Sequence, residues 1–294
     1  MDLPTKSHPL DDKFPSLRVL IPSSDPRVII VAFHRPRKRN AMNASMWREI
    51  GQVFRMLGTT GDGCRCIILT GSGKHFSAGI DVADPSFFGE NSEDDGEQQD
   101  IAHRGISFLP KIKEMQQCFT AIQDNPVPVI AAIRGSCIGA GIDIASFCDI
   151  RLCHSDAKFS IREVKVGLAA DVGTLQLFPK IVGNDSRARE LCFTGDIFGA
   201  QDALQIGFVS RISDQVLQDS IQLATKIASN SPVAIYGTKR SLVYSRDHTV
   251  AEGMDHIASH NAMALMTEDL PRSFMASAQK TTPKFSNLPP FSKL

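Results

Sequence analysis

Short apolar runs alternate with amphipathic stretches over the first two-thirds of the chain. Runs rich in β-branched residues predict buried strands at 28–33, 66–70, 127–133 and 149–153. Between them, Asn43 predicts the N-cap of one helix, and a second helix is expected over 101–123. From about residue 173 the pattern becomes mostly helical. The order of elements predicts an α/β fold whose strands end in glycine-rich turns.

No linker or internal repeat divides this pattern. We expect an N-terminal extension over 1–20, a core over 21–225, a helical subdomain over 226–280 and a tail over 281–294. The segment 89–100 reads GENSEDDGEQQD and lacks apolar periodicity, so it is expected to be a solvated loop or helix start.

Composition narrows the class of protein. Of 294 residues, 42% are hydrophobic and 22% charged, which is typical of a packed core. Lys and Arg total 32, as do Asp and Glu, so bulk electrostatics do not favour nucleic acid as a partner. No apolar run has the length of a membrane span. The seven cysteines are scattered without a CxxC pair, which predicts reduced thiols in an intracellular protein.

The two ends of the sequence bear on localisation. The first residues lack the apolar core of a signal peptide and are too acidic for a mitochondrial transit peptide. The last three residues, Ser292-Lys293-Leu294, have the sequence of a peroxisomal address that an import receptor binds. We therefore expect the peroxisome matrix or a related microbody; the alternative is a chance tripeptide on a loose tail.

Several common sites are excluded by spacing. A phosphate-binding GxxxxGK[ST] loop would need Gly at Ile68 and Ser or Thr at His75. A GxGxxG dinucleotide fingerprint fails at Ile144. His256 and His260 lie four residues apart but have no evident third ligand, so we expect no metal. No serine lies in a GxSxG elbow, which makes a serine hydrolase unexpected.

Two turns of small residues remain, at 76–81 and at 139–143. Each follows a strand, and small residues let a ligand approach backbone N–H groups. Two such turns on neighbouring strands could direct two N–H groups at one thioester oxygen that becomes an enolate, forming an oxyanion hole. For either turn taken singly, tight helix–strand packing is the favoured explanation.

Together these segments resemble the crotonase (enoyl-CoA hydratase/isomerase) superfamily over residues 28–270. The motifs are HRPRKRNAMN at 34–43, FSAGID at 76–81, VIAAIRG at 129–135 with GAG at 139–141, CDIR at 148–151 and GFV at 207–209. The resemblance implies an α/β fold with a ββα spiral core that holds an acyl-CoA site. It also implies a C-terminal helical subdomain for trimerisation, and hence a homotrimer or homohexamer.

The same resemblance assigns site residues. It implies that the backbone N–H groups of Ala78 and Ala140 form the oxyanion hole. Residues matching the family's substrate and CoA contacts are Arg37, Lys38, Ala41, Ala78, Gly79, Ile80, Asp81, Val82 and Ala140. No cofactor is expected, because coenzyme A is part of the substrate.

Three acidic residues lie where the family places its chemistry: Asp143, Glu163 and Asp171. Hydratases of the family usually have Glu, Glu and Gly at these positions. The string EVKVGLAADVGTLQ at 163–176 instead resembles the signature of the Δ3,5-Δ2,4-dienoyl-CoA isomerases of fatty-acid β-oxidation. Such an isomerase removes a proton at C2 and adds one at C6, which favours two separate carboxyl groups with raised pKa values. We expect Asp171 to serve C2, Glu163 to serve C6, and Asp143 to support them.

Alternatives remain open. A 2-enoyl-CoA hydratase would use Glu163 and Asp143 and leave Asp171 without a role. Four cations at 35, 37, 38 and 39 could indicate an RNA-binding relative, although CoA phosphates are a more natural partner in a neutral protein. Taken alone, Asp171 could be a helix N-cap and Glu163 a surface residue beside Arg162.

Overall fold

The computed structural model describes residues 4–87 and 100–291. The tripeptide at 292–294 and the acidic segment up to residue 99 lie outside the described residues. No helix within the described ranges is both long enough and apolar enough to cross a membrane.

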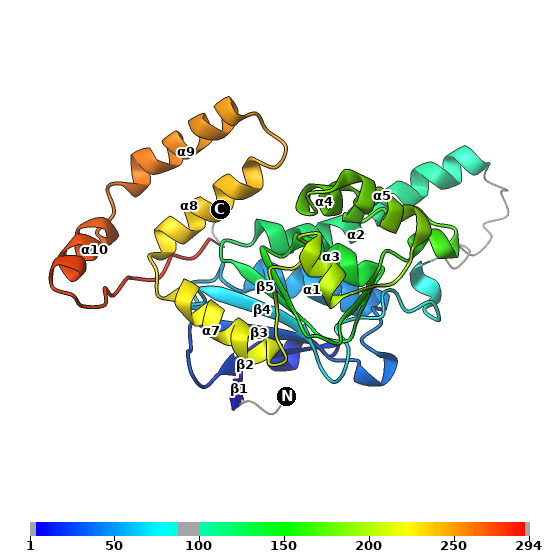
Figure 1. Cartoon of the computed structure of the whole chain (residues 1–294), viewed down its shortest axis with the longest axis horizontal. Helices are drawn as coiled ribbons and strands as arrows, with labels where there is room; N and C mark the ends of the chain where they lie inside the picture. Colours follow the sequence, from blue (N-terminus) through cyan, green and yellow to red (C-terminus); the bar gives the residue numbers. More distant parts are fainter. Residues whose placement is uncertain (1–3, 88–99, 292–294) are drawn as a thin grey trace.

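A seven-stranded sheet forms the centre of the fold (Figure 1). The first three strands pair antiparallel, and every later pair is parallel. In spatial order the strands are β1 (Thr5–Ser7), β2 (Leu17–Pro22), β3 (Val28–Phe33), β4 (Cys66–Gly71), β5 (Val129–Ile133), β7 (Ile150–Cys153) and β10 (Arg211–Ile212).

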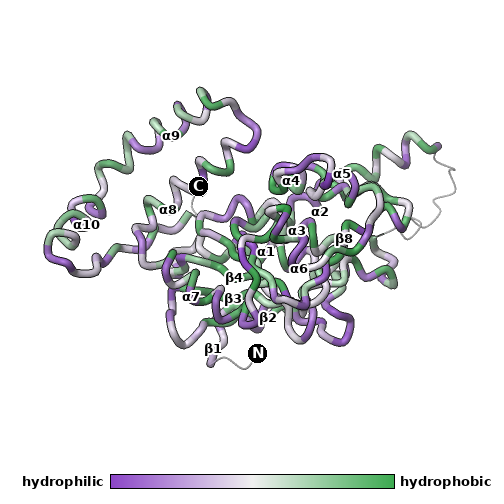
Figure 2. Tube along the Cα trace, in the orientation of Figure 1, coloured by the Kyte–Doolittle hydropathy of each residue, from purple (hydrophilic) through white to green (hydrophobic). Residues whose placement is uncertain are grey.

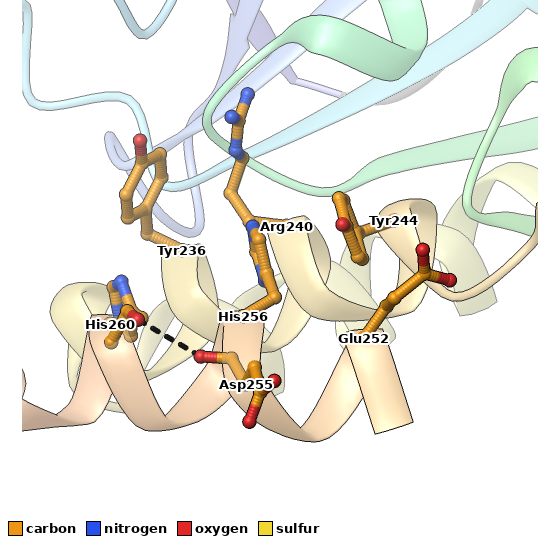
Figure 3. Close-up of a pocket in the computed structure, with 8 residues that line it drawn as sticks. Tyr236, Arg240, Tyr244, Glu252, Asp255, His256 and His260 are labelled. Atoms are coloured by element: carbon orange, nitrogen blue, oxygen red, sulfur yellow. Dashed lines mark hydrogen bonds between the residues drawn. The ribbon is translucent and has the colours of Figure 1, made fainter. Parts of the chain in front are cut away.

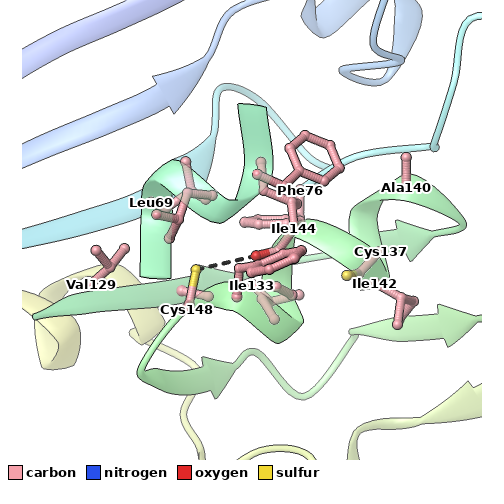
Figure 4. Close-up of a cluster of buried hydrophobic side chains, with 14 of the residues drawn as sticks. Leu69, Phe76, Val129, Ile133, Cys137, Ala140, Ile142, Ile144 and Cys148 are labelled. Carbon is pink, nitrogen blue, oxygen red and sulfur yellow. Dashed lines mark hydrogen bonds between the residues drawn. The ribbon is translucent and has the colours of Figure 1, made fainter. Parts of the chain in front are cut away.

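Helices cover both faces of this sheet. One face packs against α1 (Ala44–Met56), α2 (Ile101–Asp124) and α3 (Ala140–Phe147), and the other against α7 (Val216–Ala228). Alternate side chains of β3 divide between the two faces, with Ile29, Val31 and Phe33 on the α1 side. Figure 2 shows the resulting hydrophobic centre, and Figure 4 shows part of the larger cluster. Burial on both faces explains why β3 and β5 are entirely apolar.

A smaller sheet brings the two small-residue turns together. It contains β6 (Ser136–Ile138), β8 (Lys158–Ser160) and β9 (Phe198–Gly199). Single bridges join Ser77 to Cys137 and Ile80 to Met42, so the segment 76–81 lies between β6 and Met42. Around it lie the short 3₁₀ helix η4 (Glu163–Val166), α4 (Thr174–Ile181), α5 (Asp185–Thr194) and α6 (Ala200–Gln205).

Three C-terminal helices extend from the core as an arm (Figure 1). They are α8 (Pro232–Tyr244), α9 (Val250–Ala264) and α10 (Asp269–Ala278). Lys239 joins α8 to the core: its buried Nζ donates to the carbonyls of Ile122 at 3.2 Å and Val127 at 2.9 Å. The same ammonium forms a salt bridge with Asp149 at 2.9 Å. This cation therefore satisfies the carboxyl end of α2 and fixes where the arm leaves the core.

The predicted α/β class is confirmed, and some predicted boundaries differ. The third strand begins at Val129 rather than 127, after Pro128, which has no N–H to donate to a ladder. The sheet starts inside the predicted extension 1–20, because Leu17 and Val19 are buried against it. The predicted boundary at 225/226 falls inside α7, which packs on the sheet, so the helical arm begins at Pro232.

Candidate active site

The first small turn holds its backbone between two neighbouring segments. Gly79 has a φ of 93°, a conformation that favours glycine. A Cβ there would lie 2.9 Å from the Ile138 carbonyl oxygen and 3.8 Å from the Ala140 nitrogen. Glycine therefore allows the two small turns to lie against each other, as the sequence predicted.

The prediction for Ala78 as an oxyanion donor is wrong in this structure. Its N–H already donates to the Arg39 carbonyl at 3.0 Å. Arg39 can offer that carbonyl because it and Asn40 adopt left-handed backbone conformations, with φ values of 51° and 55°. An N–H that is bonded within the protein is not available to a ligand oxygen.

The free N–H in this turn belongs to Ile80. Met42 donates to the Gly79 carbonyl and accepts from the Asp81 N–H, both at 2.8 Å. This pattern directs the Ile80 N–H and the Asp81 N–H to opposite sides of the segment. The Ile80 N–H points away from Met42 and has no partner among residues 4–87 and 100–291.

Ala140 supplies a second N–H that has no partner in the part of the chain that the structure describes. It is the first residue of α3, and the first N–H groups of a helix have no intrahelical acceptor. The positive φ required by this turn, 52°, falls on Gly139 and not on Ala140. The added methyl group of Ala140 therefore causes no backbone strain, and the N-terminus of α3 favours negative charge at this point.

The three predicted carboxylates converge from different elements beside these donors. Asp143 lies in the first turn of α3, Glu163 begins η4, and Asp171 lies in the loop before α4. A Cβ on Gly139 would lie 3.2 Å from Glu163 Oε1, so this carboxyl group adjoins the second turn. Asp143 Oδ1 accepts the Thr174 N–H at 2.7 Å, whereas its buried Oδ2 has no hydrogen-bond partner within residues 4–87 and 100–291. The buried Oε2 of Glu163 likewise has no hydrogen-bond partner within these ranges.

Burial raises the pKa values of all three groups, and neighbouring carboxylates add to the shift for Asp143 and Glu163. Burial raises the pKa of Asp143 to about 7, and the Glu163 charge adds to this shift. Burial is also the largest cause that raises the pKa of Glu163, with a contribution from Asp171. For Asp171, burial alone raises the pKa. Carboxyl groups of this kind can hold or accept protons near neutral pH.

The simpler roles considered for single residues are not what the structure shows. Asp171 does not cap α4, whose N-cap is Gly173 without a side-chain bond; Asp143 binds the Thr174 N–H instead. Glu163 points into the protein and forms no salt bridge with Arg162 among the described ion pairs. The site therefore consists of three carboxyl groups, two of which have a buried oxygen, and two N–H donors that have no partner in the described part of the chain.

The other predicted contacts lie on the turn after β3 and at or just after the end of the first small turn. Arg37 and Lys38 are exposed on the turn after β3, and Ala41 is buried beneath it. Asp81 is held by the Arg35 guanidinium at 2.9 Å, whereas Val82 is 71% exposed. Sequence reasoning did not identify this ion pair, whose partners are separated by 46 positions.

A separate hollow of about 540 Å³ lies between α8 and α9, with no carboxylate of the site in its lining (Figure 3). Tyr244 stacks on His256 with ring centroids 4.3 Å apart. His256 Nδ1 and His260 Nε2 have no hydrogen-bond partner in the described structure, and both side chains are only partly buried. This hollow belongs to the helical arm rather than to the acid cluster.

The chain is similar in sequence to a known protein family and to several named enzymes. The family described as Enoyl-CoA hydratase/isomerase matches residues 24–287. A rat protein named Delta(3,5)-Delta(2,4)-dienoyl-CoA isomerase, mitochondrial, is 43% identical over 97% of this chain and 85% of its own length. An Arabidopsis thaliana protein named Delta(3,5)-Delta(2,4)-dienoyl-CoA isomerase, peroxisomal, is 36% identical over 94% and 99%.

A solved structure shares the fold. An enoyl-CoA hydratase from Mycobacterium tuberculosis superposes with a TM-score of 0.78 and 28% identity, covering 93% of this chain and all of that one. The predicted spiral core followed by a helical C-terminal region is thereby confirmed as the architecture.

The raised pKa of Asp143 predicts a specific pH dependence of stability. The pKa is about 7 in the folded chain and 3.8 without the fold. Between pH 3.8 and about pH 7 the folded state therefore binds more protons than the unfolded state. The free energy of unfolding falls as pH rises through this range. From about pH 5 to about pH 8 the loss attributable to this group should be on the order of 2 kcal/mol.

Asp143→Asn keeps the acceptor for the Thr174 N–H but cannot ionise. Its free energy of unfolding, measured by urea denaturation across pH, should therefore decline less steeply than that of the native chain. Asp196→Asn, at an exposed carboxylate 3.5 Å from Lys165, serves as the control and should leave the slope unchanged. Equal slopes for the native chain and Asp143→Asn would contradict the assignment.

Proposed function

We propose that this chain, which belongs to the enoyl-CoA hydratase/isomerase family, converts 3,5-dienoyl-CoA into 2,4-dienoyl-CoA in fatty-acid β-oxidation. The observation that carries the proposal is the convergence of Asp143, Glu163 and Asp171 beside two unpaired N–H groups. The relatives named dienoyl-CoA isomerases, at 43% and 36% identity over most of the chain, support it. The family membership inferred from the sequence motifs is confirmed by the match.

The reaction needs charge stabilisation at the thioester. Breaking the C2–H bond leaves an electron pair that delocalises over the diene and onto the thioester oxygen. In our proposal that oxygen accepts hydrogen bonds from the N–H groups of Ile80 and Ala140. A donor of this kind typically contributes ~10²–10³-fold to the rate. The enolate also lies at the N-terminus of α3, whose dipole favours it.

Two carboxyl groups then handle the two protons. Asp171 removes the C2 proton, and its raised pKa makes it a stronger base than an exposed aspartate. Glu163 retains a proton because of its burial and donates it at C6. The double bonds move from C3=C4 and C5=C6 to C2=C3 and C4=C5, with no net gain or loss of protons. No cofactor enters this scheme, because coenzyme A is part of the substrate.

Asp143 has a supporting role in this scheme. Its carboxyl group interacts electrostatically with that of Glu163, and it anchors the start of α4 by accepting the Thr174 N–H. A hydratase would instead use Glu163 and Asp143 to activate water and would leave Asp171 unused. The order in which the three residues contribute to the rate therefore differs between the isomerase and the hydratase reactions.

Substitution of each carboxyl group separates the two reactions. Asp171→Asn should lower isomerase kcat by at least ~10²-fold, because an amide cannot take the C2 proton. Glu163→Gln should also lose rate, and Asp143→Asn should lose less. Steady-state turnover of 3,5-dienoyl-CoA, followed by the new 2,4-diene absorbance, measures this ranking against hydration of 2-enoyl-CoA. A folded Asp171→Asn enzyme with native isomerase turnover, or a native enzyme that only hydrates, contradicts the proposal.

We further propose that the chain acts as a homotrimer or a homohexamer. The helical arm exposes large apolar side chains that a solvated monomer would leave in water. They include Leu242, Met254, Met266, Phe274 and Met275. Sedimentation velocity of the full chain should give a trimer or hexamer mass, and Phe274→Glu should shift it toward smaller species. A stable and fully active native monomer would contradict this assembly.

We also propose residence in the peroxisome matrix, with Ser292-Lys293-Leu294 as the receptor-bound address. One relative is named peroxisomal and the rat protein mitochondrial, so relatives occupy both organelles. The preceding segment is tied to the core: Arg65 donates to the Phe285 carbonyl at 2.6 Å and to Asn287 Oδ1 at 2.9 Å.

Removal of 292–294 tests this address. A fluorescent protein fused at the N-terminus should follow the full chain into peroxisomes and remain cytosolic after the deletion, with isomerase activity retained. The assay uses cells that lack the full-length protein, so that assembly with it cannot carry the truncated chain. Import of the truncated chain, or mitochondrial location of both, would overturn the proposal.

A further inference from the structure

Resting on the proposed function, we propose that Gln116 is a positioning residue that sets the direction of the Asp171 carboxylate. Its side-chain Nε2 donates to the Asp171 carbonyl oxygen at 2.7 Å, across 55 positions of sequence. Gln116 lies on α2 and does not belong to the acid cluster.

The loop that carries Asp171 has few hydrogen bonds, although Ala170 and Val172 on either side of Asp171 are buried. At its start the Leu168 N–H donates to the Glu163 carbonyl at 3.0 Å, and at its end the Thr174 N–H donates to Asp143 Oδ1 at 2.7 Å. Between these two points, the Gln116 amide forms the one side-chain hydrogen bond to the loop within residues 4–87 and 100–291. This bond is made at the residue whose side chain is proposed to take the C2 proton.

Gln116 is itself held in a rigid place. The preceding residue, Met115, accepts the Trp47 indole N–H at 3.0 Å. The Trp47 ring stacks on Phe119 with centroids 4.2 Å apart, one helical turn beyond Met115. These contacts fix the C-terminal half of α2 against α1. The Gln116 amide is therefore a fixed point from which the loop can be oriented.

The side of the loop that faces the core packs on Phe147, which contacts Phe119. Phe147 lies edge-on to Phe119 at 6.4 Å. A Cβ on Gly173 would lie 2.5 Å from the Phe147 ring, so the loop lies directly on this ring. The ring and the burial of Val172 limit movement of the loop toward the core. The hydrogen bond from Gln116 additionally holds the Asp171 carbonyl, which restricts rotation of the peptide plane that follows the Asp171 Cα and thereby the placement of its side chain.

Loss of this bond has two consequences. The Asp171 carboxylate moves away from C2, and misplacement of about 1 Å can cost ~10²-fold in rate. Water also reaches the carboxyl group, which reduces the burial that raises its pKa. A catalytic base with a lower pKa ionises at lower pH. The acidic limb of the profile of kcat/KM against pH should therefore shift to lower pH.

The test compares two neighbouring substitutions on α2. Gln116→Met removes the donor at nearly constant volume, and Gln117→Met makes the same change at an exposed side chain with no hydrogen bond in the described structure. For Gln116→Met we expect isomerase kcat to fall roughly 10–100-fold with KM nearly unchanged. We also expect the acidic limb of kcat/KM to shift to lower pH. Gln117→Met should match the native enzyme in each respect.

A second variant covers the case in which Gln116→Met does not fold. Gln116→Glu keeps the shape and can donate only when protonated, so its kcat relative to the native enzyme should rise as pH falls. Native kcat and pH profile in Gln116→Met, or a pH-independent ratio for Gln116→Glu, would overturn the positioning role. Absence of isomerase activity in the native enzyme and in Gln117→Met would instead refute the proposed function, so the two failures are distinguishable.

Discussion

A single buried carboxyl group organises the site. One oxygen of Asp143 binds the Thr174 N–H at 2.7 Å and so fixes where α4 begins, while the other oxygen is buried without a partner. An unpaired buried carboxylate opposes folding, and burial together with Glu163 raises its pKa to about 7. The rest of the structure supplies the rigidity that holds this unfavourable arrangement, and proton transfer near neutral pH is the property that it provides.

Irregular backbone supplies the second requirement, which is N–H groups that are not used inside the protein. Sheets and helices use nearly all of their donors internally, so a site needs positions where the pattern ends. Among the described residues, the bridge to Met42 leaves the Ile80 N–H without a partner, and the start of α3 does the same for the Ala140 N–H. Glycine at 79 and 139 lets these two breaks come within contact of each other. Charge stabilisation thus depends on where regular structure stops, and proton transfer depends on which side chains are buried beside it.

Sequence patterns predicted those features that depend on local chemistry. The apolar run at 28–33 became β3, and Asn43 caps α1 through the Met46 N–H at 3.0 Å. The three carboxylates were recognised from motifs, and the structure brings them together. The choice of Ala78 failed because the composition of a turn does not show which N–H is free; that depends on Arg39 and Met42, which are distant in sequence. Gln116 was missed for the same reason, since its partner lies 55 positions away.

The central claim is that two different carboxyl groups serve C2 and C6, and isotopic labelling tests it most directly. A 3,5-dienoyl-CoA carrying deuterium at C2 should be isomerised in ordinary water and the product analysed by NMR. If Asp171 takes the label and Glu163 donates a separate proton, C6 gains hydrogen from solvent and the removed deuterium appears in water. Quantitative transfer of the deuterium from C2 to C6 would show that one group carries the proton the whole way, and would contradict the account.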